Sequence, residues 1–222
     1  MSATESAPPA TGVDQPADAG IWKAWVLLCI AEASRMGLTP LASAQLHVLL
    51  YLANTLAPLF EVVRVRGQVL KRGPYPFYPD VQREVDRLSF CGVLRIDHVD
   101  FGPKGHLSAH YSLGIHGRHL HASIVDSAKE AQRTARLFRE LVSACFGKFL
   151  GSKTAIGPAD ANYGSNEVLE GRIVDFSEWQ DENRNMDVAR YLIEQLRSLQ
   201  PRAARDGVRL YCEYLDRAMS TV

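Results

Sequence analysis

The order of segments between residues 42 and 113 constrains the fold of this chain more than any other feature of its sequence. The segments are an apolar helix, a basic connection, a second helix and two strands around a Gly-Pro-Lys-Gly turn: residues 42–56, 64–72, 79–91, 93–101 and 106–113. Helix, loop, helix, strand, turn, strand is the order of a winged helix. The sequence therefore predicts a winged-helix body, a fold that usually binds nucleic acid or another protein and rarely catalyses a reaction.

The predicted fold class is α+β and mainly helical, with a two-stranded wing and a helical C-terminal extension. Residues 1–20 are rich in Ala, Pro, Ser, Thr, Asp and Glu and contain no Lys or Arg, which predicts a disordered tail rather than a signal peptide. Residues 21–121 are expected to form the winged-helix domain, and residues 122–222 a helical region that packs on it. Helices are expected at residues 21–36, 123–149, 186–199 and 206–219.

Charge is balanced over the whole chain. Lys plus Arg and Asp plus Glu each number 25, so the formal net charge is zero. A domain that binds DNA unaided is usually more basic, so a contact with nucleic acid is expected to be local or shared with a partner. The most apolar stretch, residues 25–33, is far shorter than the roughly 20 residues that span a bilayer. The cysteines lack the spacing of a metal site, and we expect a cytoplasmic protein with reduced thiols and no membrane contact.

Seven basic residues form a candidate contact surface for DNA or for an acidic partner. They lie in the connection, on the following helix and at the turn between the strands: Arg64, Arg66, Lys71, Arg72, Arg83, Arg87 and Lys104. A recognition helix and a wing tip meet the backbone and groove of DNA in this way. The alternative is a solvated or protein-facing surface, because Asp80, Glu84 and Asp86 on the same helix can pair with the arginines and would repel phosphate.

Two further patterns suggest a ligand but do not meet its requirements. His116, His119 and His121 are close in sequence, yet no single element turns all three towards one point, so we predict a polar linker here. Residues 147–154 nearly match a phosphate-binding loop, but Ser152 replaces the second glycine and the segment follows a predicted helix rather than a strand. We therefore predict no metal and no other cofactor.

An aromatic and acidic segment, residues 171–183, is the remaining candidate site. Asp175 and Glu178 could form an acid–base pair, but no histidine or nucleophile is near them in sequence. Phe176 and Trp179 either anchor the segment to the body or belong to a protein interface with an acidic rim. These four residues are the candidate interface, with simple anchoring as the alternative, and no enzyme activity is predicted.

Two blocks of sequence resemble a known family. The first joins Gln-Leu-His-Val-Leu-Leu-Tyr-Leu-Ala at residues 45–53 with residues 73–78 and 84–94, and the second is Val-Asp-Phe-Ser-Glu-Trp at residues 174–179 with Asn183. Together they resemble the middle component of ABC-three-component anti-phage defence systems of the Lamassu type, which are built around an SMC-like ATPase. The first block is also similar to the Panacea-type antitoxin domain.

The resemblance implies a non-catalytic accessory subunit that bridges an SMC-like ATPase and an effector, expected to be a nuclease, in a bacterial defence complex. Its implied partners are that ATPase, the effector and, through the complex, double-stranded DNA. No family catalytic residue is carried over to this chain. The alternative expectation is a winged-helix DNA-binding regulator or antitoxin, which would form a dimer and bind a specific DNA site with steep salt dependence.

Overall fold

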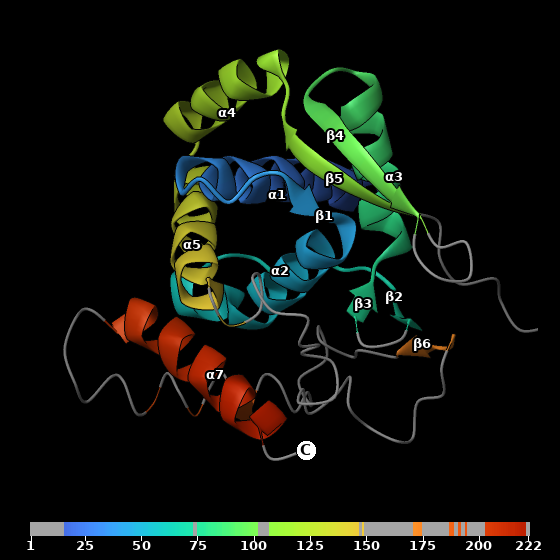
Figure 1. The fold of residues 1–222 in the computed structure, drawn as a ribbon. Coiled ribbons are helices and arrows are strands. Elements are labelled where there is room, and N and C mark those ends of the chain that lie inside the picture. Colours follow the sequence, from blue (N-terminus) through green and yellow to red (C-terminus); the bar gives the residue numbers. More distant parts are fainter. Residues whose placement is uncertain are drawn as a thin grey trace, which may run out of the picture.

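The computed structural model describes residues 16–72, 75–101, 107–146, 148, 171–174, 187–188, 191, 194 and 203–220. In this part of the chain the fold is α+β and mainly helical, as predicted (Figure 1). Its helices are α1 (Pro16–Arg35), α2 (Ser43–Leu56), the 3-10 helix η1 (Ala57–Phe60), α3 (Pro79–Phe90), α4 (Ile115–Ser127), α5 (Lys129–Cys145) and α7 (Ala203–Ser220). Its strands are β1 (Leu41–Ala42), β2 (Val69–Arg72), β3 (Tyr75–Phe77), β4 (Leu94–Phe101), β5 (Leu107–Leu113) and β6 (Ile173–Val174).

Helix α1 lies at the centre of the molecule because it is apolar on nearly all sides. A helix with this pattern is stable only when other elements cover it all round. Helices α2, α3, α4 and α5 and strand β5 all pack against α1, as Figure 1 shows. Trp25 meets Trp22 and Phe138 of α5 edge to face, with ring centroids 5.9 and 5.6 Å apart. The described helices of this core include none that is both long and apolar enough to cross a membrane.

The strands form two small antiparallel sheets. In the first, the order is β1-β5-β4, with Leu41 opposite Tyr111 and Leu94 opposite Leu113. In the second, the order is β3-β2-β6, and this sheet lies on the far side of α2 from α4 (Figure 1). Strand β2 therefore pairs with β3, which follows it within a few residues, and with β6, which lies about a hundred residues further along the chain.

One hydrophobic core joins the elements before and after residue 121. Leu49 of α2, Phe138 of α5 and Tyr211 of α7 all belong to it, and each is at most 1 % exposed. The expected boundary between two regions, at residues 121 and 122, falls inside helix α4. Helix α1 begins at Pro16, earlier than the predicted start at residue 21, and residues 1–15 lie outside the described part of the chain.

Two local predictions are wrong. Residues 72–79 contain three prolines, which predict an irregular loop, but Tyr75–Phe77 forms strand β3. Pro76 is compatible with this strand because β3 lies at the edge of its sheet, where a missing N–H interrupts no second ladder. The polar linker predicted around the histidines is instead the helix α4, which ends before Ala128 adopts an extended conformation (φ −137°, ψ 123°) and α5 begins.

Candidate functional site

The basic segment, residues 64–72, is fixed to the core through its main chain. The buried side chain of Asn54 donates from Nδ2 to the Val65 carbonyl oxygen at 3.0 Å and accepts from the Val65 N–H at 2.9 Å. The Trp22 indole N–H donates to the carbonyl oxygen of Arg66 at 3.1 Å. Residues 61–68 have no regular secondary structure, so these side chains replace the hydrogen bonds that a helix or sheet would supply.

The four basic side chains of this segment differ in exposure. Arg66 and Arg72 are exposed, whereas Arg64 and Lys71 are half-buried. Arg72 lies across the β2–β3 pair, with its guanidinium 5.2 Å from the centre of the Phe77 ring, a cation–π contact. The segment therefore presents positive charge from a rigid main chain, as a surface for phosphate or carboxylate groups requires.

The arginines of helix α3 are paired with acids of the same helix. Arg83 lies 3.1 Å from Asp80, and Arg87 pairs with Glu84, whose side chain is only 2 % exposed and also lies 3.5 Å from Lys23. Helix α3 carries two arginines and three acids, so it does not present an excess of positive charge. This pairing is the one proposed in the alternative interpretation of the basic surface, and it weakens a role for α3 in phosphate contact.

Five candidate residues cannot be placed. Lys104, Asp175, Phe176, Glu178 and Trp179 lie outside the described residues. The wing-tip contact and the aromatic and acidic interface therefore stay predictions. The neighbouring strand β6, Ile173–Val174, pairs with β2, so the segment leading to the predicted interface starts beside the basic segment.

The β4–β5 hairpin has one polar and one apolar face. Side chains alternate along a strand, and residues opposite each other share a face. Beyond a register irregularity between Ile96 and His98, the apolar face carries Val99, Phe101 and Leu107, which are 42 %, 82 % and 65 % exposed. The polar face carries His98, Asp100, Ser108 and His110.

A second exposed apolar area lies where α3 ends. Phe90, the last residue of α3, is 94 % exposed, and it lines an open pocket together with Ser89, Leu94 and Ile96. Isolated exposed apolar side chains are common in soluble proteins, but a concentration of large ones is typical of interaction surfaces. Neither this pocket nor the apolar hairpin face was identified from the sequence, because the pairing of the strands determines which side chains stay uncovered.

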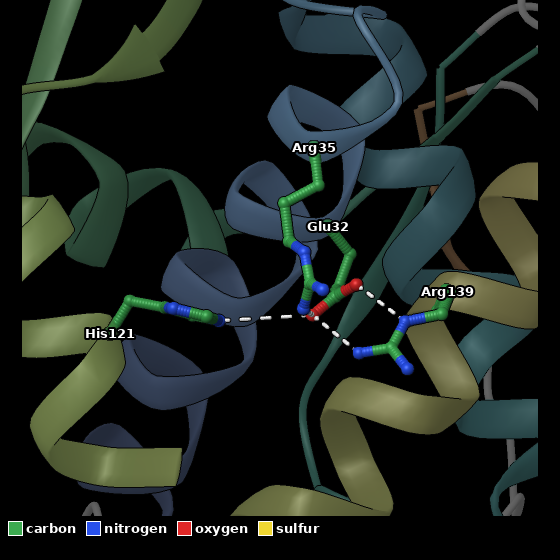
Figure 2. Close-up of polar contacts among 4 residues, drawn as sticks. All are labelled: Glu32, Arg35, His121 and Arg139. Atoms are coloured by element: carbon green, nitrogen blue, oxygen red, sulfur yellow. Dashed lines mark hydrogen bonds and ion pairs between the residues drawn. The ribbon is translucent and has the colours of Figure 1, made fainter.

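A buried carboxylate, that of Glu32, joins three helices. Glu32 of α1 is 1 % exposed and accepts two hydrogen bonds from Arg139 of α5, at 2.9 and 3.3 Å, and one from Arg35 at 3.3 Å. Its Oε1 also lies 3.8 Å from Nε2 of His121, which comes from α4 (Figure 2). The hydrogen bond to Glu32 raises the pKa of Arg139, whereas burial lowers the pKa of His121. The arrangement connects α1, α4 and α5.

The three histidines considered for a metal do not converge. His121 is directed at Glu32, while His116 and His119 are exposed on the same helix α4. All three belong to one helix, where residues at these spacings cannot all share a face.

His47 is a buried histidine that connects α2 to the segment before α3. Its Nδ1 accepts from the Tyr78 backbone N–H at 3.3 Å, so its Nε2 is the donor towards Oε1 of Gln82, also at 3.3 Å. Burial lowers the pKa of His47 to about 4, against a smaller opposing effect of the Gln82 hydrogen bond. The side chain is therefore neutral at pH 7, and its two hydrogen bonds join α2 to Tyr78 and to α3.

Comparison with known proteins gives no relative. No protein-family model matches the chain, and neither a curated protein nor a solved structure matches it. What the chain does must therefore be inferred from its own residues and their geometry.

Proposed function

We propose that this chain is a non-catalytic accessory subunit that binds other proteins through a winged-helix body, and that it bridges an SMC-like ATPase and an effector nuclease in an anti-phage defence complex. The observation that carries the proposal is the exposure of large apolar side chains at the end of α3 and on one face of the β4–β5 hairpin. The identities of the two partners come from the sequence resemblance alone.

The winged-helix interpretation is supported by the order and pairing of the elements. Helices α1, α2 and α3 precede the β4–β5 hairpin, and the short strand β1 between α1 and α2 adds to the hairpin in the order β1-β5-β4. Residues 57–77 are then an insertion between α2 and α3 that carries η1, β2 and β3. In this interpretation α3 is the recognition helix and the hairpin is the wing.

Protein contact is favoured over DNA contact by the chemistry of these two elements. Phe90, Phe101 and Leu107 are 94 %, 82 % and 65 % exposed, and burying such side chains against a partner is favourable by roughly 25 cal/mol for each Å² removed from water. Phosphate, by contrast, is bound by cations, and the arginines of α3 are already paired with Asp80 and Glu84. The centre of a protein interface is typically rich in aromatic side chains and poor in charged ones.

The test is co-purification of the tagged chain with the proteins encoded beside its gene. The native chain should recover an SMC-like ATPase together with a second protein, and Phe90→Asp or Phe101→Asp should lose at least one of them. Tyr214→Asp on α7, where the ring is also exposed, is the matched control and should retain both. Recovery of the chain alone, or partners unaffected by both substitutions, would contradict the proposal.

The basic segment favours a second candidate function, a winged-helix DNA-binding regulator or antitoxin. Residues 64–72 carry four basic side chains and no acid, on a main chain fixed by Asn54 and Trp22. A regulator would be a dimer whose affinity for one DNA site falls steeply with salt. Light scattering and a DNA-site selection distinguish the two functions: a dimer with a preferred site, weakened by charge reversal at Arg64, Arg66, Lys71 and Arg72, would favour the regulator.

A further inference from the structure

The polar face of the β4–β5 hairpin gathers three side chains of the types that bind metals. His98 of β4 lies directly opposite His110 of β5, and Asp100 follows His98 by two residues, so all three project from the same face. The ligating atoms of the three lie within 4.8 Å of one another. His110 Nε2 lies 2.8 Å from Asp100 Oδ2, and His98 Nε2 lies 4.0 Å from the same oxygen.

A β-bulge brings the two histidines opposite each other. The register advances by two residues on β4, from Ile96 to His98, while it advances by one on β5, from Tyr111 to His110. In a regular ladder without this bulge, His110 would face Asp97 instead of His98. Asp97 is engaged elsewhere, by Arg95 at 2.6 Å. Bulges of this kind re-aim side chains and are over-represented next to functional sites.

We propose that His98, Asp100 and His110 bind one divalent transition-metal ion, with zinc the best match, through the two Nε2 atoms and the Asp100 carboxylate. Two ligand atoms on a tetrahedral zinc at 2.0–2.1 Å lie about 3.3 Å apart, a value between the two separations observed here. The imidazole rings stack with centroids 3.8 Å apart and an interplanar angle of 22°. Because a metal ion lies in the plane of each imidazole that binds it, the exposed His98 ring turns out of this stack when the ion binds. The separation of 4.0 Å between His98 Nε2 and Asp100 Oδ2 exceeds the tetrahedral value by under about 1 Å, and the exposed His98 side chain can move closer.

The ligand set determines which ions fit. Two imidazoles and one carboxylate suit zinc and its neighbours among the transition metals, whereas calcium and magnesium prefer oxygen ligands alone. Three protein ligands leave a fourth position for water or for a group of another molecule. A bound ion would cross-link β4 to β5 and stabilise the hairpin whose opposite face carries Phe101 and Leu107. This site lies on the opposite face of the hairpin from Phe101 and Leu107, so metal binding does not depend on the identity of any protein partner.

The experiment is a titration of the full chain, purified without a histidine tag and stripped of metal, with Zn²⁺ alone by calorimetry and with Co²⁺ alone by absorption spectroscopy. Cys91→Ser serves as the background because Cys91 is an exposed thiol that could bind either ion. We expect one equivalent of metal and a visible Co²⁺ spectrum of tetrahedral type without a sulfur-to-cobalt band. His110→Ala and Asp100→Asn should each weaken binding at least tenfold, since even partners outside the ligand set contribute about 10- to 100-fold.

The control variant is His119→Ala, which removes an exposed histidine from α4 and should leave affinity unchanged. Zn²⁺ should also raise the melting temperature of the parent chain but not of His110→Ala, because only a ligand that binds the folded state stabilises it. Circular dichroism of each variant verifies that it is folded. The proposal is overturned by the absence of saturable binding, by binding that persists in a His98→Ala/His110→Ala double variant, or by equal loss in His119→Ala.

Discussion

His47 makes the stability of the fold depend on pH. Its pKa is about 4 in the folded chain, whereas an unfolded histidine titrates near 6.5. Between these values the unfolded chain binds more protons, so the free energy of unfolding falls as the pH falls through this window, by roughly 3 kcal/mol in total. His121, whose pKa burial also lowers, contributes in the same direction. Urea unfolding across this pH range should reveal the loss.

The variant His47→Gln tests which histidine is responsible. Glutamine can still accept from the Tyr78 N–H and does not titrate, so the variant should be less stable at neutral pH but lose less stability on acidification. His116→Gln, at an exposed histidine, should retain the pH dependence of the parent chain. A His47→Gln variant with an unchanged pH dependence would show that another group titrates.

Of the two members of the Glu32–Arg139 ion pair, removal of Arg139 should cost more stability than removal of Glu32. Arg139→Met takes the bidentate cation away from a carboxylate that is 1 % exposed. Breaking a fully buried pair costs about 3–5 kcal/mol, and the cost here should fall below that range because Arg35 still pairs with Glu32. Glu32→Met leaves Arg139, whose side chain is 48 % exposed and can turn to water, so the cost should be clearly smaller. Urea unfolding of both variants measures the difference, and equal costs or the reverse order would contradict this account.

Glu32 also shows what a sequence can and cannot indicate about single residues. It is the only acid in the apolar part of α1, so a buried charge that needs a partner could have been suspected there. The partner could not be identified, because Arg139 is 107 residues away and helical periodicity describes only neighbours within one helix. Arg83 and Arg87, by contrast, pair with acids three residues before them on the same helix α3. Pairs at this spacing can be predicted because both members belong to one helix.

At the level of elements, the packing of α4 should reverse the usual effect of a glycine substitution. Replacing glycine by alanine inside a helix usually stabilises it by about 0.5–1 kcal/mol. Gly117 of α4 is buried, and a Cβ atom there would overlap the carbonyl oxygen of Val93. Gly117→Ala should therefore destabilise the chain, which thermal denaturation would detect.

Gly20 of α1 provides the matched comparison. It is an exposed helical glycine, and a Cβ atom built there has no atom within 4 Å. Gly20→Ala should leave the melting temperature unchanged or raise it slightly. If both substitutions were neutral, α4 would not be held against Val93 as closely as described.

Helices with strong local patterns were predicted nearly to the residue, whereas features that depend on how strands pair were not. The expected helices at residues 42–56 and 79–91 correspond to α2 (Ser43–Leu56) and α3 (Pro79–Phe90) because apolar periodicity and prolines mark them locally. Strand β3 was missed because the prolines in and around it argue against a regular element, and the bulge in β4 was missed because only the pairing with β5 reveals it. The metal-ligand set on the hairpin depends on that bulge, so sequence reasoning did not find it.

At the level of the whole molecule, α5 and α7 complete the core that α1 and α2 begin. The Sγ atoms of Cys145 and Cys212 lie 3.8 Å apart where α5 meets α7, and both residues are fully buried. Cys29, also fully buried, lies in α1, and burial raises the pKa of its thiol. A shared core predicts that the parts on either side of residue 121 unfold together, although the sequence suggested two regions.

Thiol labelling across a urea gradient, resolved by peptide mass spectrometry, tests this cooperativity without any substitution. Buried thiols react only when the surrounding structure opens, so Cys29, Cys145 and Cys212 should become reactive at one common urea midpoint. Exposed Cys91 is the internal control and should react before any unfolding. If Cys145 and Cys212 reacted at a clearly lower midpoint than Cys29, the C-terminal helices would be a separately unfolding unit. A common midpoint would instead mean that a partner bound at the hairpin stabilises α7 as well, because binding to one part of a cooperative unit stabilises all of it.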